Sequence, residues 1–120
     1  MRPRHVLVVE DHDDAREAVC CLLEVRGHRV EAAADGPAAV DAALTSRPEV
    51  VLVDIGIPGL DGYEVARRLR ASNVGKHMML VAVTGYGQAH DRQRALESGF
   101  DAHLVKPIDP DELYRLLEHA

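Results

Sequence analysis

Hydrophobic and polar positions follow two kinds of pattern along the chain. Short apolar runs, typical of strands, alternate with longer stretches in which apolar residues recur every three or four positions, as on one face of a helix. The first run, HVLVV, is continuously apolar, which predicts a strand buried on both faces. The apolar runs predict five strands, over residues 5–9, 28–34, 49–53, 78–83 and 102–105.

Helical spacing predicts a helix after each strand. The first is expected to start at Asp14, which Glu17 follows three residues later, and to end near Gly27. The second is expected to open at Gly36-Pro37, with proline at the first helical position. The other helices are predicted over residues 62–71, over residues 89–98 and after residue 109.

Regular alternation of strands and helices is typical of an α/β fold. Such a chain forms a doubly wound parallel sheet with helices on both faces and right-handed crossovers. A length of 120 residues suits one domain, which we expect to span residues 1–120.

The charge balance bears on the class of partner. The chain carries 20 acidic and 14 basic residues, a net charge of −6, which argues against a nucleic-acid surface. A short basic run at Arg67, Arg68 and Arg70 is interpreted as the solvated face of a helix.

Cellular location is inferred from cysteine use and from apolar runs. Cys20 and Cys21 are adjacent in a helical pattern and match neither a disulfide framework nor a zinc site, so a reducing, cytoplasmic setting is expected. No apolar run approaches the roughly 20 residues that span a membrane, and the start MRPRH is too short for a signal peptide. We therefore expect no membrane partner.

Polar residues stand where the predicted strands end. Glu10-Asp11 follows the first strand, Asp54 the third, Thr84 the fourth and Lys106 the fifth. The carboxyl ends of parallel strands share one edge of the sheet, where open α/β sheets bind ligands. Taken singly, Asp54 or Asp11 could be a helix or turn cap, Thr84 a turn residue and Lys106 a surface lysine. Their coincidence at one edge favours a site.

The chemistry of that edge indicates phosphoryl transfer to a carboxylate. Three carboxylates repel one another, and Mg²⁺, a hard divalent cation with oxygen ligands, relieves the repulsion. Lys106 and the Thr84 hydroxyl can stabilise an anion, and the backbone N–H groups around Gly56 and Gly85 are open to one because no side chain obstructs them. Asp54 would be the nucleophile that accepts the phosphoryl group.

Four motifs carry a family resemblance. VVED (8–11), LVDIGIPGLDGYEVARRLR (52–70), VTGYGQ (83–88) and LVKPID (104–109) resemble, as an ordered set, the response-regulator receiver domain of two-component signalling, over about residues 4–118. The residues of these motifs look most like those of receivers attached to hybrid sensor histidine kinases. The resemblance implies a flavodoxin-like fold with strand order 2-1-3-4-5. It also implies phosphorylation of Asp54 by a phosphohistidine of a histidine kinase or histidine phosphotransfer protein.

The resemblance also implies a metal site. Glu10 and Asp11 match the acidic pair that holds Mg²⁺ (or Mn²⁺), although the pair is Glu-Asp rather than the commoner Asp-Asp; Asp54 and the backbone carbonyl of Gly56 complete the ligands. Gly56 and Tyr86 occupy positions that tune dephosphorylation in similar domains. Because Gly56 has no side chain to position a water, we expect no fast water-assisted dephosphorylation by this residue. The histidines outside position 103 are predicted to bind no metal, with His12 at the rim of the site.

Conformational switching is implied as well. Thr84 and Lys106 match the switch hydroxyl and the phosphate-binding lysine, and the Lys106-Pro107 bond is cis in similar domains. His103 stands where the family usually has Tyr or Phe as a rotating switch residue. Phosphorylation is expected to shift the face of the fourth helix, fifth strand and fifth helix, including Tyr114. A downstream protein, a covalently attached domain or a second copy of the chain would bind there.

Two other classes of function compete with this interpretation. A phosphate-independent receiver-like interaction module is the first, but such modules usually lose an acid, the Asp or the Lys, and all are present here. An enzyme on a similar scaffold is the second. A flavodoxin needs a Ser/Thr/Gly-rich phosphate loop after the first strand, where this chain has EDHDD, and topoisomerase-primase or haloacid-dehalogenase sites need a second Asp where Gly56 stands. We therefore expect a phosphoacceptor rather than an enzyme.

Overall fold

The structure is a computed structural model that describes residues 2–85 and 89–120. The strands are β1 (His5–Val9), β2 (Arg29–Ala33), β3 (Val50–Asp54), β4 (Met79–Thr84) and β5 (Ala102–Val105). The helices are α1 (Asp13–Val25), α2 (Gly36–Ser46), α3 (Gly62–Ala71), a 3₁₀ turn η1 (Gly75–His77), α4 (Ala89–Ser98) and α5 (Pro110–Glu118). The strands pair in parallel in the order β2-β1-β3-β4-β5, which confirms the predicted flavodoxin-like fold.

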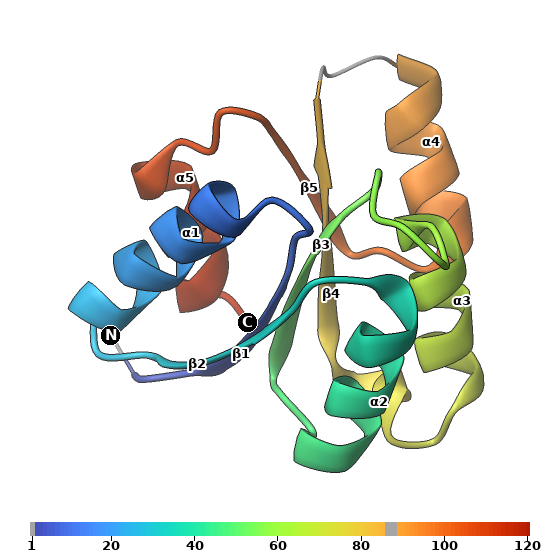
Figure 1. Ribbon diagram of the computed structural model, residues 1–120, viewed down its shortest axis with the longest axis horizontal. Helices are drawn as coiled ribbons and strands as arrows, with labels where there is room; N and C mark the ends of the chain where they lie inside the picture. The colour runs from blue at the N-terminus through green and yellow to red at the C-terminus, as the bar shows by residue number, and fades with distance from the viewer. Residues whose placement is uncertain (1, 86–88) are drawn as a thin grey trace.

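Helices cover both faces of the sheet (Figure 1). Helices α1 and α5 lie on one side and α2, α3 and α4 on the other. Alternate residues of β1 enter opposite cores: Val6 and Val8 pack with α1 and α5, whereas Leu7 and Val9 pack with α2 and α3. Residues 6–9 of β1 and 50–53 of β3 are apolar and buried on both faces of the sheet, as predicted for the first strand.

The start of α1 differs from the sequence prediction. Asp14 lies inside the first turn, and the N-cap is His12, whose backbone carbonyl accepts from the Arg16 N–H at 2.9 Å. The His12 side chain makes no capping hydrogen bond. An ion pair between Asp13 and Arg16 stabilises this first turn instead. The side chain of His12 is therefore available to the site described below.

The C-terminal end of α1 and the N-terminal end of α2 show ordinary capping. Gly27, with a φ of 86°, follows the last turn of α1 in the left-handed conformation that glycine adopts at no cost. Helix α2 begins as predicted at Gly36, but Pro37 is its second residue, not its first. Asp35 is the N-cap, and its carboxylate accepts from the Ala38 N–H at 2.8 Å.

The basic run of α3 is only partly a solvated face. Arg68 is exposed, but the side chain of Arg70 is only 21 % exposed and donates to the carbonyls of Gly99 and Met78 at 2.8 Å and of Gly75 at 3.0 Å. Arg70 also pairs with Asp101. The interpretation of this residue as solvated was wrong, because the η1 turn, the residue after it and the residue after α4 present backbone carbonyls to it.

None of the helices within residues 2–85 and 89–120 is long and apolar enough to cross a membrane.

Candidate functional site

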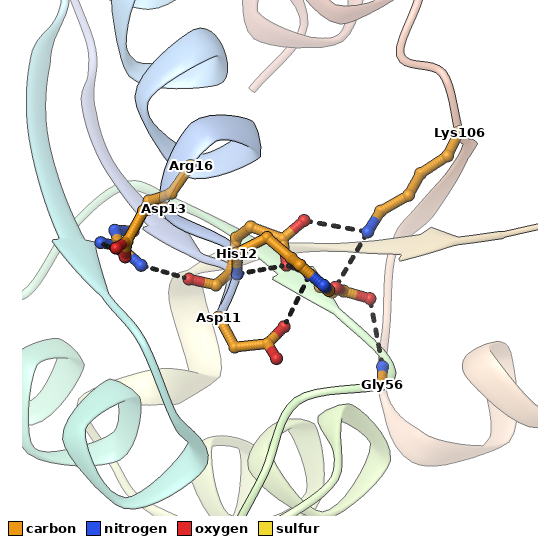
Figure 2. A network of polar contacts seen from close by, with 8 residues as sticks. Asp11, His12, Asp13, Arg16, Gly56 and Lys106 are labelled. Carbon is orange, nitrogen blue, oxygen red and sulfur yellow. Dashed lines mark hydrogen bonds and ion pairs between the residues drawn. The ribbon is translucent and has the colours of Figure 1, made fainter.

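One lysine joins two acids at the carboxyl edge of the sheet. The Nζ atom of Lys106 donates to Oε1 of Glu10 and to Oδ2 of Asp54, each at 2.9 Å (Figure 2). These residues stand just after β1, at the end of β3 and just after β5. Parallel pairing of the intervening strands brings them together from positions 52 and 96 residues apart. The predicted convergence of Glu10, Asp54 and Lys106 at this edge of the sheet is therefore confirmed.

The pKa values of the Glu10 and Asp54 carboxyl groups are shifted in opposite directions. Burial and the neighbouring Asp54 raise the pKa of Glu10 above its ordinary value, and Lys106 only partly offsets this. Burial also opposes ionisation of Asp54, but hydrogen bonds with Glu10, Lys106 and the Gly56 N–H together lower its pKa. Burial opposes the charge of Lys106, but the two carboxylates outweigh it and raise the pKa of Lys106. Asp54 is thus the group held as an anion at neutral pH.

Asp11 supplies the part of the site that fits a cation. Its Oδ1 atom is buried and has no hydrogen-bond partner among the residues that the structure describes. One carboxylate oxygen each from Glu10 and Asp11 and one ring nitrogen of His12 lie within 4.8 Å of one another. Among the described residues, these three side chains form a group that could share a metal ion. An unpartnered buried carboxylate oxygen is costly unless a cation binds it, so these residues fit the divalent ion expected from the sequence.

The two glycines of the site leave room beside Asp54. The Gly56 N–H donates to Oδ1 of Asp54 at 3.1 Å, and a Cβ on Gly56 would meet only that oxygen, at 3.9 Å. A Cβ on Gly85 would meet no described atom within 4 Å. The predicted backbone contacts to an anion are sterically open at both positions.

Thr84 and His103, predicted as switch residues, are in contact. Thr84 is the last residue of β4, one position beyond the residue that pairs with Asp54, and it is buried. Its Oγ1 lies 2.9 Å from Nε2 of His103 on β5, in a hydrogen bond whose direction depends on the imidazole tautomer. The imidazole therefore takes a polar role at this position that Phe could not take.

Some predicted features are placed differently or lie outside the described residues. The hydroxyl of Tyr114 donates to the Leu22 carbonyl at 3.0 Å and its ring contacts Arg26, so Tyr114 packs against α1 rather than standing free on the outer face of α5. Tyr86 lies outside the described residues. The Lys106-Pro107 bond is cis, as the resemblance implied.

Two further features of the site were not predicted from the sequence. Arg16 donates to the Glu10 backbone carbonyl at 3.0 Å and so anchors the loop that carries the acidic pair. An apolar cavity of about 700 Å³ opens beside Asp54 and Lys106 and is walled by Ala18 and Leu22 of α1 and by Ile108. An i, i+3 pair of charges could have suggested the place of Arg16, but the cavity depends on how α1 packs on the sheet.

Comparison with known proteins decides the family. The family described as response regulator receiver domain matches residues 6–118, almost the whole chain. The chain belongs to the receiver-domain family. Receiver domains are the phosphoacceptor modules of two-component systems, in which histidine kinases or phosphotransfer proteins are their partners.

Relatives of this receiver domain differ in length. It is 36 % identical over 113 residues to an uncharacterized 14.6 kDa protein of Leptolyngbya boryana, covering 94 % of this chain and 86 % of that protein. It is also 36 % identical over 110 residues to the phosphate regulon transcriptional regulatory protein PhoB of Escherichia coli, covering 92 % of this chain but 48 % of PhoB. This receiver domain thus spans about half the length of that regulator.

Solved receiver structures share the fold. A putative response regulator from Chloroflexus aurantiacus aligns with a TM-score of 0.93 at 28 % identity, over 98 % of this chain and 97 % of that one. The receiver domain of the sensor histidine kinase PA1611 from Pseudomonas aeruginosa, solved with a magnesium ion coordinated in its active-site cleft, aligns with a TM-score of 0.90 at 33 % identity, over 98 % and 97 % of the two chains. Receivers with this fold therefore include one with Mg²⁺ bound at its active site.

Proposed function

We propose that this receiver domain accepts a phosphoryl group on Asp54 from a phosphohistidine. The observation that carries the proposal is the contact of Lys106 Nζ with both Asp54 and Glu10 at 2.9 Å, which places a fixed cation against an ionised carboxylate. The cation neutralises charge that a phosphoryl group brings to the acceptor. We propose that the chain takes part in the transfer as acceptor and assists its own phosphorylation and dephosphorylation, without acting as an enzyme on another substrate.

The transfer needs little acid–base chemistry from the protein. A carboxylate oxygen of Asp54 forms the new P–O bond, the donor's P–N bond breaks, and the released imidazole takes its proton from solvent. Asp54 enters as an anion because its pKa is lowered, so no base has to remove a proton. Thr84, the Gly85 N–H and Lys106 would stabilise the oxygens of the transferred group.

Glu10, Asp11, Asp54 and the Gly56 carbonyl would hold Mg²⁺ (or Mn²⁺). When bound, the ion supplies charge neutralisation for the phosphoryl oxygens. The unpartnered Asp11 Oδ1 supports this assignment, because within the described residues nothing else satisfies that atom.

The surroundings of Asp54 favour a protein as the donor. The cavity beside Asp54 is walled by apolar side chains of α1 and by Ile108, a surface that a protein can bury. We therefore propose a histidine kinase or histidine phosphotransfer protein as the partner, in the cytoplasm.

We propose that phosphorylation shifts the equilibrium of the α4–β5–α5 face. Thr84, moved toward the phosphoryl group, would change its contact with His103 on β5 and so couple the site to that face. A downstream protein, an attached domain such as that of a hybrid histidine kinase, or a second copy would read the change. A phosphate-independent interaction module is the alternative.

Intact mass after incubation with acetyl phosphate and Mg²⁺ tests the proposal. We expect one phosphoryl group on the native chain and none on Asp54→Asn. Asp41→Asn, the same change at an exposed carboxylate of α2, should be labelled like the native chain. Absence of label on the native protein, or equal label on Asp54→Asn, would overturn Asp54 as the acceptor of this donor.

A further inference from the structure

The residue after the acidic pair, His12, turns its ring toward that pair (Figure 2). Its Nδ1 lies 3.4 Å from Oδ1 of Asp11 and 3.7 Å from Oε2 of Glu10. The ring is 77 % exposed and makes no capping bond to α1, although His12 is the N-cap of that helix. Packing therefore does not hold the ring over the carboxylates.

The contact between His12 and Asp11 does not satisfy either atom. At 3.4 Å it lies beyond a good hydrogen bond, and Asp11 Oδ1 has no hydrogen-bond partner among the described residues. Imidazole nitrogen and carboxylate oxygen both carry lone pairs that bind a metal ion. A cation shared by the two would satisfy both.

The basic side chains of the site other than His12 bind other atoms, and Oε2 of Glu10 accepts a long hydrogen bond, 3.5 Å, from the His12 backbone N–H. Lys106 contacts Oε1 of Glu10, while Oε2 is the oxygen that faces His12. Arg16 uses its guanidinium on the Glu10 backbone carbonyl and on Asp13, not on Asp11. Among the residues that the structure describes, no basic side chain other than His12 pairs with the Asp11 carboxylate.

We propose that His12 is a nitrogen ligand of the metal site and directs it toward first-row transition ions. Oxygen-only sites suit Mg²⁺, whereas imidazole binds Mn²⁺ weakly and Zn²⁺ strongly and contributes little to Mg²⁺. Loss of His12 therefore weakens Mn²⁺ and Zn²⁺ binding and spares Mg²⁺. The inference rests on the proposed function for the location of the metal site, and it replaces the expectation that His12 binds no metal.

Pulsed electron paramagnetic resonance of the Mn²⁺-loaded protein tests the ligand directly. Electron spin-echo modulation detects ¹⁴N bonded to Mn²⁺. We expect ¹⁴N modulation in the native chain and in His77→Gln, a matched change at an exposed histidine of η1, and none in His12→Gln. Titration should show the Kd for Zn²⁺ raised about tenfold in His12→Gln, a smaller rise for Mn²⁺ and no change for Mg²⁺.

The opposite results overturn the inference. Absence of ¹⁴N modulation in the native chain would mean that His12 only pairs with the carboxylates, and modulation retained in His12→Gln would mean a nitrogen from elsewhere. Equal Zn²⁺ affinities for native chain and His12→Gln would also overturn it. These readouts need no phosphoryl donor, so a chain that binds Mn²⁺ through His12 but takes no phosphate contradicts the proposed function alone.

Discussion

Replacing Lys106 with methionine removes the single ammonium that two acids share. Lys106→Met keeps most of the side-chain volume and takes away both 2.9 Å contacts, to Glu10 and to Asp54. The two carboxylates then face each other without a counter-charge. We expect a less stable protein at neutral pH, and a deficit that shrinks in acid.

The size of the effect follows from the distances. A pair of unit charges 2.9 Å apart interacts by about 6 kcal/mol at an effective dielectric of 20 and by about 1.4 kcal/mol in water. The Lys106 side chain is 35 % exposed, so solvent screening places each contact between these limits. Removing one partner from a largely buried set of charges costs about 3–5 kcal/mol, and screening favours the lower end, about 3 kcal/mol.

The pH dependence has a defined sign. The pKa of Glu10 is already raised in the folded protein, and loss of Lys106 raises it further. Because the pKa of Glu10 is higher in the folded chain, the folded chain takes up a proton at a higher pH than the unfolded chain as the pH falls. Stability of Lys106→Met is therefore highest below the unfolded value of 4.5 and is lost as the pH rises through the folded value.

Urea unfolding followed by circular dichroism, with EDTA present, measures this at about pH 7 and about pH 5. Lys76→Met is the matched control, because Lys76 is the other lysine of the chain and is exposed on η1. If Lys106→Met unfolds like the native protein and the control at both pH values, the electrostatic reasoning about this site is refuted.

Three further predictions concern residues outside the acceptor carboxylate. A double-mutant cycle of Thr84→Val and His103→Phe should give a coupling of about 1 kcal/mol in urea unfolding, and additive effects would show that their hydrogen bond is not stabilising. Arg70→Met should lose about 3 kcal/mol of stability, because the carbonyls of Gly99, Gly75 and Met78 each lose a charged donor. The exposed Arg68→Met should change stability little, and equal effects would contradict the anchoring role. Burial, and then the nearby Arg4, lower the pKa of His28 below 6.5, so the free energy of unfolding of the native chain should fall as the pH drops below about 6.5. His28→Gln should lack that part of the acid sensitivity. Identical pH profiles of stability for the two chains would contradict this role of His28.

The fold and the convergence of polar strand ends at one edge of the sheet could be predicted from the sequence, because both depend on periodicity and on where the strands end. The proximity of Asp54 and Lys106 could be predicted from the sequence alone, since parallel strands place their carboxyl ends at one edge of the sheet. The bounds of β1, α3, α4 and β5 were predicted to the residue.

Other features depended on partners that no local pattern reveals. Arg70 is anchored by carbonyls from η1 and from residues after α4, so its burial could not be inferred from the basic run on α3. Asp14 was expected to start α1, but the backbone of His12 caps the helix and an Asp13–Arg16 pair stabilises it. The orientation of the His12 ring likewise depends on where the loop after β1 places the acidic pair.

The lysine bridge also constrains when the site can exist during synthesis of the chain. Its two contacts close loops of 52 and 96 residues, so the N-terminal strands and helices can form long before the lysine reaches them. A nascent chain emerging from the ribosome carries Glu10 and Asp54 well before Lys106, the ammonium that joins them, has been made. On the proposed function, competence to be phosphorylated would be acquired last, and a chain truncated before residue 106 would be expected to be a poor acceptor.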